Sequence, residues 1–218
     1  MSAIPIPRPQ HSPARLAVLI SGSGTTLRNL AAKIADKSLP AVLTNVISSR
    51  SQVKGIERAK ALGLPVQVID RRSFENVEAF SEVLATELAR YQPDYVIMAG
   101  FLSLWLVPPQ YQWRVLNIHP ALLPAFGGKG MHGHRVHDAV IAARQKVSGC
   151  TVHFADNQYD HGPILLQRQC PVLPDDVPET LAARVFEQEC IAYPQAIKML
   201  IEHHWQIVAG RAEAVQNK

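Results

Sequence analysis

Short runs of apolar residues alternate with segments of helical periodicity through the first half of this chain. The apolar runs, which predict buried strands, cover residues 16–21, 41–49, 65–69, 94–99 and 115–118. The segments with helical periodicity between them cover residues 25–35, 52–62 and 74–91. Strands that are apolar on both faces and separated by helices are typical of a parallel sheet with helices on both sides. The pattern therefore predicts an α/β fold with a Rossmann-like, mostly parallel twisted sheet.

The pattern changes after residue 120. A glycine-rich loop leads there into a helix, two strands and a long amphipathic helix, which we place at residues 127–130, 134–144, 150–155, 164–169 and 178–202. The chain contains no internal repeat, and we expect one domain over residues 15–209. Residues 1–14 are rich in proline and polar groups and are predicted to form a flexible leader. Residues 210–218 are predicted to be a frayed tail.

Composition and charge narrow the class of protein. The 218 residues are 47% hydrophobic and 18% charged, with a net charge of +4, which is ordinary for a soluble globular domain. Lysine and arginine are dispersed, so no binding to nucleic acid is expected, and no apolar run reaches the ~20 residues of a membrane helix. The three cysteines lack the close spacing of a disulfide scaffold or a structural zinc site. We expect a soluble protein in a reducing, cytoplasmic compartment that acts on small molecules.

Asn117 and His119 stand at the end of the last apolar run of the first half. Side chains two residues apart on a strand point to the same face, so the amide and the imidazole should project side by side. Pro120 ends the strand, and parallel sheets bind ligands at the carboxyl ends of their strands. An amide donor beside a titratable ring suits a reaction in which an oxygen becomes negative while a proton moves. The alternative is structural, with a buried amide that satisfies backbone groups and a histidine that holds the next loop.

Asp160 lies in a predicted turn between two strands and is a candidate carboxylate partner for His119. Such a pair would orient the ring and raise the pKa of the histidine, as general acid–base catalysis requires. The alternative is an ordinary turn residue, which the following His-Gly-Pro sequence favours. His153, on a neighbouring predicted strand, is on its own more typical of a structural histidine.

The first predicted strand runs into the sequence Ser-Gly-Ser-Gly-Thr-Thr at residues 21–26. Glycines let the backbone approach a ligand, and the free N–H groups at a helix start favour an anion, so this loop is predicted to bind a phosphate. It does not match a Walker loop, and Leu27 stands where a dinucleotide fingerprint needs its third glycine. The alternative is a tight turn in which Thr25 caps the helix.

His132, His134 and His137 form a cluster beside the glycine-rich loop. Their spacings of two and three residues do not match helical metal-ligand spacing, and acidic residues nearby are few. We therefore expect no bound metal and assign these histidines to a loop or a helix start.

Several segments together resemble the phosphoribosylglycinamide formyltransferases, folate-dependent enzymes of purine biosynthesis within the wider formyltransferase family. The matching motifs lie at residues 21–26, 117–120, 122–124, 151–154 and 160–164, and the resemblance runs from about residue 16 to residue 208. It implies the formyltransferase fold. It also implies a phosphate-binding half over about residues 15–114 and a catalytic and folate-binding half over about residues 115–209.

The resemblance implies transfer of a formyl group from 10-formyltetrahydrofolate, as co-substrate, to the amine of glycinamide ribonucleotide, without a metal. The residues implied to be catalytic are Asn117, His119 and Asp160. Those implied to bind the ribonucleotide are Gly24, Thr25, Thr26 and Glu189. Those implied to bind the folate are Met98, Phe101, Leu102, Ser103, Leu104, His153 and Asp156.

Three positions depart from the pattern of the family. Ser103 and Val77 stand where many members carry arginine, and Phe186 stands where relatives often have a polar group near the phosphate. Because Val77 and Phe186 weaken the expected phosphate clamp, we hypothesise that Arg71 or Arg72 compensates.

The sequence leaves several alternatives open. The formyl acceptor could be another amine, such as an amino sugar nucleotide, or water, as in a formyltetrahydrofolate hydrolase. A third alternative is a binding protein that keeps the fold without activity. The loop at residues 127–131 could be a lid or an ordinary surface loop, and a homodimer is kept open.

Overall fold

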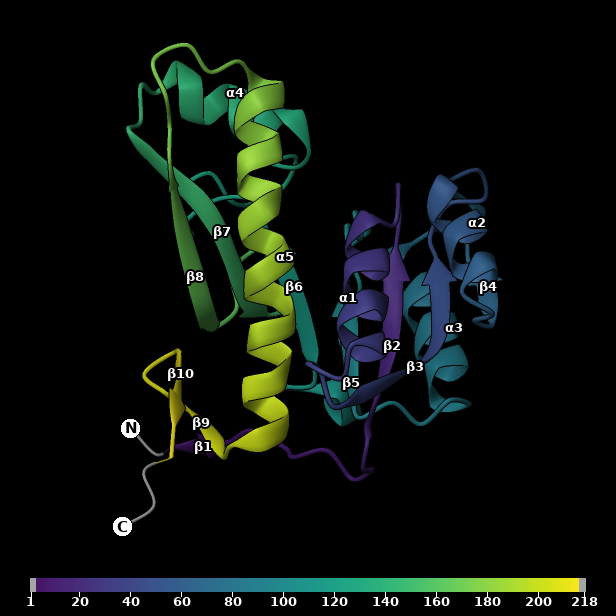
Figure 1. The fold of residues 1–218 in the computed structure, drawn as a ribbon. Coiled ribbons are helices and arrows are strands. Elements are labelled where there is room, and N and C mark those ends of the chain that lie inside the picture. The colour runs from purple at the N-terminus through teal and green to yellow at the C-terminus, as the bar shows by residue number, and fades with distance from the viewer. Residues whose placement is uncertain (1–2, 216–218) are drawn as a thin grey trace.

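The strands of this chain form one mixed sheet in the computed structural model, which describes residues 3–215 (Figure 1). Within these residues the sheet has ten strands in the order β1-β9-β10-β8-β7-β6-β5-β2-β3-β4. The strands are β1 (Ile4–Pro5), β2 (Ala14–Ile20), β3 (Ala41–Ser48), β4 (Val66–Val68), β5 (Tyr95–Met98), β6 (Val115–His119), β7 (Val147–Phe154), β8 (Ile164–Pro171), β9 (Trp205–Val208) and β10 (Arg211–Ala214). The α-helices are α1 (Thr25–Ala35), α2 (Lys54–Ala61), α3 (Val77–Ala89), α4 (His134–Ala142) and α5 (Pro178–Glu202), and the 3₁₀ helices are η1 (Arg71–Ser73) and η2 (Pro109–Tyr111).

Strand β2 is apolar from Leu16 to Ile20 because each of its faces there lies in a different hydrophobic core. Leu16, Val18 and Ile20 belong to the core covered by α1, α2, α4 and α5, whereas Ala17 and Leu19 belong to the core covered by α3. Side chains alternate between the faces of a strand, so a strand buried on both sides has no polar positions. The helices therefore cover both faces of this part of the sheet, as the sequence predicts.

The order of the strands reverses at β2. The chain proceeds outward from β2 to β3 and β4, returns to β5 on the other side of β2, and continues to β6, with all these pairs parallel. Ligands bind parallel α/β sheets in the crevice at the carboxyl ends of the strands beside such a reversal. Here the segments after β2 and β5 meet there, since the Ser21 N–H donates to the Gly100 carbonyl at 3.0 Å.

The second half of the chain extends the sheet with antiparallel strands. β7 pairs antiparallel with both β6 and β8, and α5 packs across β7 and β8 and against α1 (Figure 1). The buried Tyr193 hydroxyl of α5 lies 3.0 Å from the Met98 carbonyl and 2.9 Å from the Leu116 carbonyl. This single O–H group is shared between carbonyls of the neighbouring strands β5 and β6 and holds α5 against them.

Predicted and observed elements agree closely in the central fold and differ at its margins. The helices at residues 25–35 and 178–202 match at both ends. The helix expected over residues 74–91 instead begins at Val77, because the Asn76 side chain accepts the Ala79 N–H at 2.8 Å and caps it. None of the helices within residues 3–215 is both long enough and apolar enough to cross a bilayer.

The flexible leader expected over residues 1–14 is wrong for the part that the structure describes. Ile4 and Pro5 pair with β9 at the edge of the sheet. The next residue, Ile6, buries its apolar side chain in the core, which fixes this stretch in place. The expected frayed tail is likewise wrong at residues 211–214, which form β10 and pair with β9. Residues 1–2 and 216–218 lie outside the described residues. The division of the domain into two functional halves stays a prediction.

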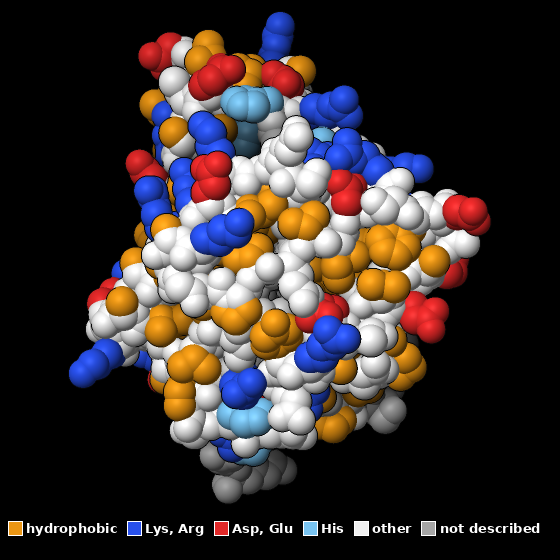
Figure 2. All heavy atoms as spheres, turned by 90° about the vertical axis from the view of Figure 1, so that its right-hand side faces the viewer, with side chains coloured by type: hydrophobic (Ala, Val, Ile, Leu, Met, Phe, Trp, Pro, Cys, Tyr) orange, Lys and Arg blue, Asp and Glu red, His pale blue; other side chains and the backbone are white. Residues whose placement is uncertain are grey.

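Figure 2 shows the side of the molecule that carries β4, α2 and α3. On this face the lysine and arginine side chains lie interspersed with acidic and apolar ones. This distribution matches the dispersed charge of the sequence.

Candidate active site

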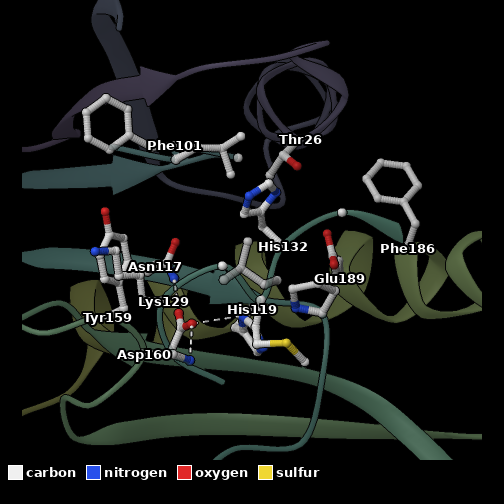
Figure 3. Close-up of a pocket in the computed structure, with 18 of the residues that line it drawn as sticks. Thr26, Phe101, Asn117, His119, Lys129, His132, Tyr159, Asp160, Phe186 and Glu189 are labelled. Atoms are coloured by element: carbon white, nitrogen blue, oxygen red, sulfur yellow. Dashed lines mark hydrogen bonds and ion pairs between the residues drawn. The ribbon is translucent and has the colours of Figure 1, made fainter. Parts of the chain in front are cut away.

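Three side chains from two neighbouring segments converge beside the end of β6. Asn117 Nδ2 lies 3.4 Å from Asp160 Oδ1, and His119 Nδ1 lies 3.4 Å from Asp160 Oδ2 (Figure 3). Asn117 and His119 share a face of β6, and Asp160 comes from the loop between β7 and β8. The structure thus brings together the amide, the imidazole and the carboxylate that the sequence singles out. Their catalytic roles stay predictions.

His153 fixes the orientation of the Asn117 amide. The His153 Nδ1 atom lies 2.9 Å from the Phe154 carbonyl, which can only accept, so Nδ1 carries the hydrogen. In the neutral ring, Nε2 then accepts a hydrogen bond from Asn117 Nδ2 at 3.0 Å. The second N–H of the amide points toward Asp160 Oδ1, at the longer distance of 3.4 Å. The Asn117 amide is therefore held in one orientation with one N–H only weakly engaged.

His119 is held by its other ring nitrogen. Nε2 donates to the Phe126 carbonyl at 2.8 Å, which leaves the lone pair of Nδ1 facing Asp160 in the neutral ring. Burial lowers the pKa of His119 below its usual value, and the Asp160 charge offsets this only in part. Asp160 thus raises the histidine pKa as expected, but the larger effect of burial makes the net shift downward. A neutral His119 at pH 7 can accept a proton at Nδ1, where the carboxylate would stabilise it.

Asp160 stays ionised although it is largely buried. Burial alone would raise the pKa of its carboxyl, but His153, the His119 charge and the Gly128 N–H together lower it below the usual value. The Gly128 N–H donates to Asp160 Oδ2 at 3.0 Å. The preceding Gly127 permits this approach, since an added Cβ would lie 2.5 Å from Leu123 Cδ2. The glycine-rich loop therefore helps to hold the carboxylate.

The loop after β2 presents unpaired backbone N–H groups at the start of α1. Gly24 is the N-cap residue with φ of 74°, and no side chain caps the helix. A Cβ on Gly24 would lie 2.8 Å from the Gly55 Cα, so only glycine fits this close packing. The alternative in which Thr25 caps the helix is wrong, because Thr25 is the first helical residue. The first N–H groups of the helix are free to bind an anion.

A cavity of about 430 Å³ connects this helix start to the catalytic cluster. Thr25 and Thr26 line it together with Asn117, His119, Asp160, Phe186 and Glu189, as Figure 3 shows for most of them. Burial raises the pKa of Glu189 to about 8, so this carboxyl is mostly protonated at pH 7. A neutral carboxyl can both donate and accept a hydrogen bond.

A second, smaller cavity adjoins the cluster on its other side. It holds about 60 Å³, and Asn117 and Asp160 line both cavities. Six of the seven residues expected to bind the folate line it, namely Met98, Phe101, Ser103, Leu104, His153 and Asp156. The seventh, Leu102, lines the larger cavity.

An open hollow of about 680 Å³ continues outward from the small cavity. Arg71, Val77, Ser103 and Lys129 line it, so two positions that depart from the family pattern share one hollow. The Arg71 Nη1 donates to the Phe74 carbonyl at 2.9 Å, and its guanidinium lies 5.8 Å from the centre of the Phe80 ring.

The structure does not support a role for Arg71 or Arg72 at the phosphate. Neither residue lines the cavity with Thr25 and Thr26. Arg72 instead pairs with Asp70, with an N–O distance of 2.8 Å. Val77 likewise lines the outer hollow and not the cavity beside α1, so it lies apart from the predicted phosphate site.

Several groups that shape the site escaped the sequence analysis. The Phe126 carbonyl and the Gly128 N–H are backbone groups, for which residue type gives no signal. The Thr151 hydroxyl donates to the Ala121 carbonyl at 2.7 Å and accepts from the Leu123 N–H at 3.0 Å and from Gln167 Nε2 at 2.8 Å. Thr151 therefore holds the loop that follows His119. Its position opposite His119 on the paired strands is the signal that would have found it.

The three clustered histidines point to different surroundings. His132 lines the larger cavity, His134 is exposed with Nδ1 3.9 Å from Glu179, and His137 is buried on α4. Among residues 3–215, no group of three or more His, Cys, Asp or Glu side chains is arranged to hold a metal ion. The expectation that no metal binds stays a prediction.

Comparison with known proteins identifies the family. The model of the family described as "Formyl transferase" matches residues 14–197. The chain belongs to the formyl transferase family. The mostly parallel α/β sheet is thus confirmed as a formyltransferase fold. Among solved structures, glycinamide ribonucleotide transformylase 1 from Symbiobacterium toebii has a TM-score of 0.85 at 36% identity, covering 93% of this chain and 94% of that one.

Two plant proteins are also similar in sequence to this formyltransferase. The chloroplastic phosphoribosylglycinamide formyltransferase of Arabidopsis thaliana is 36% identical over 215 residues, which are 95% of this chain and 73% of the relative. That of Vigna unguiculata is 38% identical over 192 residues, which are 86% of this chain and 61% of the relative. The chain thus spans less than two thirds of the second relative.

Proposed function

We propose that this formyltransferase transfers the formyl group of 10-formyltetrahydrofolate to the amine of glycinamide ribonucleotide in purine biosynthesis. The observation that carries the proposal is the convergence of Asn117, His119 and Asp160 at the border between two cavities. A group-transfer enzyme needs such a border, because donor and acceptor must meet at one carbonyl carbon. The names of these relatives support the same acceptor. A trifunctional purine biosynthetic protein of Bos taurus, 37% identical over 193 residues, supports the pathway.

The larger cavity receives the ribonucleotide in this proposal. Its phosphate binds the free backbone N–H groups of Gly24, Thr25 and Thr26 and the hydroxyls of the two threonines, where the helix dipole favours negative charge. Its ribose hydroxyls bind Glu189, whose protonated carboxyl can serve as donor and acceptor. This arrangement directs the glycinamide amine toward Asn117 and His119.

The folate approaches from the other side. The pterin occupies the small cavity between Phe101, Leu104 and His153, and Asp156 offers acceptors for its polar edge. The acidic tail of the folate continues into the outer hollow, where Arg71 and Lys129 supply positive charge. In this position the formyl group reaches the catalytic cluster.

The reaction needs one proton to move while a carbon–nitrogen bond forms and another breaks. The amine attacks the formyl carbon, and the N–H of Asn117 that is only weakly engaged by Asp160 donates to the oxyanion and stabilises it. His119 Nδ1 accepts the proton of the amine, and the imidazolium is stabilised by Asp160. His119 then returns the proton to the departing folate nitrogen. A positioned acid–base group contributes about 10²–10⁴ in rate, and an oxyanion donor about 3–4 kcal/mol.

The test is a direct assay. The protein is mixed with 10-formyltetrahydrofolate and glycinamide ribonucleotide, and the deformylated folate and the formylated product are followed together. Equal amounts of both products, formed only when the ribonucleotide is present, are expected. Release of formate without any amine would instead identify a hydrolase, and turnover only with an amino sugar nucleotide would identify another acceptor. No turnover with any amine would contradict the proposal.

We also propose a cytoplasmic location and a homodimer. A cytoplasmic location agrees with three free cysteines, of which Cys150 and Cys170 are buried. A homodimer is tested by sedimentation of the purified protein, and the compartment by fractionation of the producing cells.

A further inference from the structure

The end of the larger cavity beside α1 has little positive charge. A phosphate monoester carries about −1.5 to −2 charges at pH 7, whereas a helix start supplies only about half a positive charge. From the opposite side, α5 presents the apolar ring of Phe186 and the carboxyl of Glu189 (Figure 3). A basic side chain at this end would balance the phosphate.

Three basic side chains of the described residues line this cavity, namely His119, Lys129 and His132. His119 is already engaged by the Phe126 carbonyl and by Asp160. Lys129 also lines the outer hollow and is drawn in Figure 3 on the side of Tyr159. Neither is therefore available at the end of the cavity beside α1.

His132 meets the requirement. It is exposed, it lines the cavity, and in Figure 3 its ring is drawn on the side of Thr26. None of the hydrogen bonds and ion pairs found among residues 3–215 uses the His132 ring, so both of its nitrogens are free for a ligand. The turn that carries it is closed by a hydrogen bond from the Met131 N–H to the Gly128 carbonyl, at 3.0 Å. The same loop segment thus holds Asp160 through Gly128 and presents His132 to the cavity.

We propose that His132 donates a ring N–H to the phosphate of the ribonucleotide and makes the enzyme prefer phosphorylated acceptors. This inference rests on the proposed function, because it places the phosphate at the start of α1. The imidazole then contacts the phosphate from beside the backbone N–H groups of Thr25 and Thr26. The glycine-rich loop is then part of the substrate site and not an ordinary surface loop.

Arg58 is the competing source of charge. Its Nη1 donates to the Ser23 carbonyl at 2.6 Å from α2, so its guanidinium lies beside the same loop. Arg58 does not line the cavity, however. We therefore assign it to anchoring the loop, and the experiment compares both residues.

The experiment measures the preference for a phosphorylated acceptor. The ratio of kcat/KM for glycinamide ribonucleotide to kcat/KM for its phosphate-free nucleoside is determined for the full chain and for His132→Ala, His132→Lys, His134→Ala and Arg58→Gln. In His132→Ala we expect the ratio to fall about tenfold, through a higher KM for the ribonucleotide, because a hydrogen bond to a charged group is lost. In His132→Lys the ratio should largely recover. His134→Ala is the matched control, since His134 is exposed and does not line the cavity, and its ratio should not change.

Three kinetic outcomes would overturn the inference. An unchanged ratio in His132→Ala removes the contact, and an equal loss for both acceptors assigns His132 a purely structural role. A fall in Arg58→Gln with none in His132→Ala assigns the charge to α2. A binding measurement keeps the inference separate from the proposed function. Ribose 5-phosphate, but not ribose, should shift the NMR signals of the His132 ring, whichever amine the enzyme formylates, and no shift with either would contradict the inference.

Discussion

The Asp160 carboxylate faces Nδ1 of His119 across 3.4 Å, while the other nitrogen of the ring donates to a backbone carbonyl. This pairing determines where a proton can be gained, because Nε2 already carries its hydrogen. Burial keeps the ring neutral at pH 7, and the ionised Asp160 carboxylate is placed to stabilise the positive charge that the ring gains during the reaction.

Replacing this carboxylate should slow the reaction and shift its pH profile. Asp160→Asn removes the charge that raises the pKa of His119, so we expect a kcat/KM lower by about 100-fold or more. The acid limb of the profile follows protonation of His119 and lies below pH 6.5 in the unaltered enzyme. In the variant its midpoint should lie lower still. A profile measured from pH 5 to pH 9 tests this, with the exposed Asp175→Asn as the control, and an unchanged plateau would refute it.

Glu189 should make the stability of the protein depend on pH. Burial raises its pKa from 4.5 to about 8 in the folded state. The stabilisation linked to this shift is fully present below pH 4.5 and is lost as the pH rises toward 8, because the folded state holds the proton that the unfolded state has released. Relative to Glu189→Gln, the free energy of unfolding should fall by at most about 1.4 kcal/mol per pH unit in this window.

Urea unfolding at several pH values measures this difference. Glu187→Gln, which changes an exposed neighbour on α5, serves as the control and should run parallel to the unaltered protein. If the difference between Glu189→Gln and the unaltered protein is constant with pH, the shift of the Glu189 pKa is wrong.

His153 should act through Asn117. His153→Leu removes the acceptor that holds the amide at 3.0 Å, so the amide can turn and present its oxygen to the oxyanion. We expect kcat to fall by about tenfold or more. His153→Gln, which keeps an acceptor, should retain more activity. The Asn117 side-chain amide signals in a ¹⁵N spectrum report the orientation directly, and unchanged signals in His153→Leu would exclude this role.

Thr151→Val should weaken both the fold and the catalyst. The hydroxyl serves Ala121, Leu123 and Gln167, and all three contacts are lost in a residue of the same shape. Leaving buried polar groups unpaired costs about 1–3 kcal/mol of unfolding free energy. The loop after His119 should also loosen and lower kcat. Thr151→Ser keeps the hydroxyl and should restore both properties; equal stability of the two variants would contradict this account.

Arg71 should affect the folate and not the ribonucleotide. Arg71 lines the outer hollow, so Arg71→Ala should raise the KM for 10-formyltetrahydrofolate a few-fold, an effect typical of a charge near the surface and reduced by salt. The KM for the ribonucleotide should not change. Arg72→Ala is the matched control, because Arg72 pairs with Asp70 outside the cavities. If Arg71→Ala instead raised only the KM for the ribonucleotide, Arg71 would contribute to phosphate binding after all.

The sequence predicts the parts of this molecule that depend on side-chain periodicity. Alternation along β6 places Asn117 and His119 on one face, and both are found at the edge of the cavity. The long helix at residues 178–202 is predicted to its ends, because proline begins it and apolar spacing persists through it.

What the sequence misses depends on backbone groups and on distant pairing. The net pKa of His119 required knowledge of how deeply the ring is buried, which Asp160 alone does not reveal. The hollow shared by Val77 and Ser103 required the three-dimensional path of the chain, since the two residues follow different strands. Strand β1 is too short and too rich in proline to give a signal, and it exists only through its partner β9.

The pairing of β1 with β9 also has a consequence for biosynthesis. Ile4 lies opposite Ile207, so β1 can pair only after β9, which is synthesised near the end of the chain described here, has been made. During translation the core around β2 can form while residues 4–6 have no partner, and this margin closes only after α5 has left the ribosome. The order of synthesis therefore makes β1 one of the last strands to join the sheet.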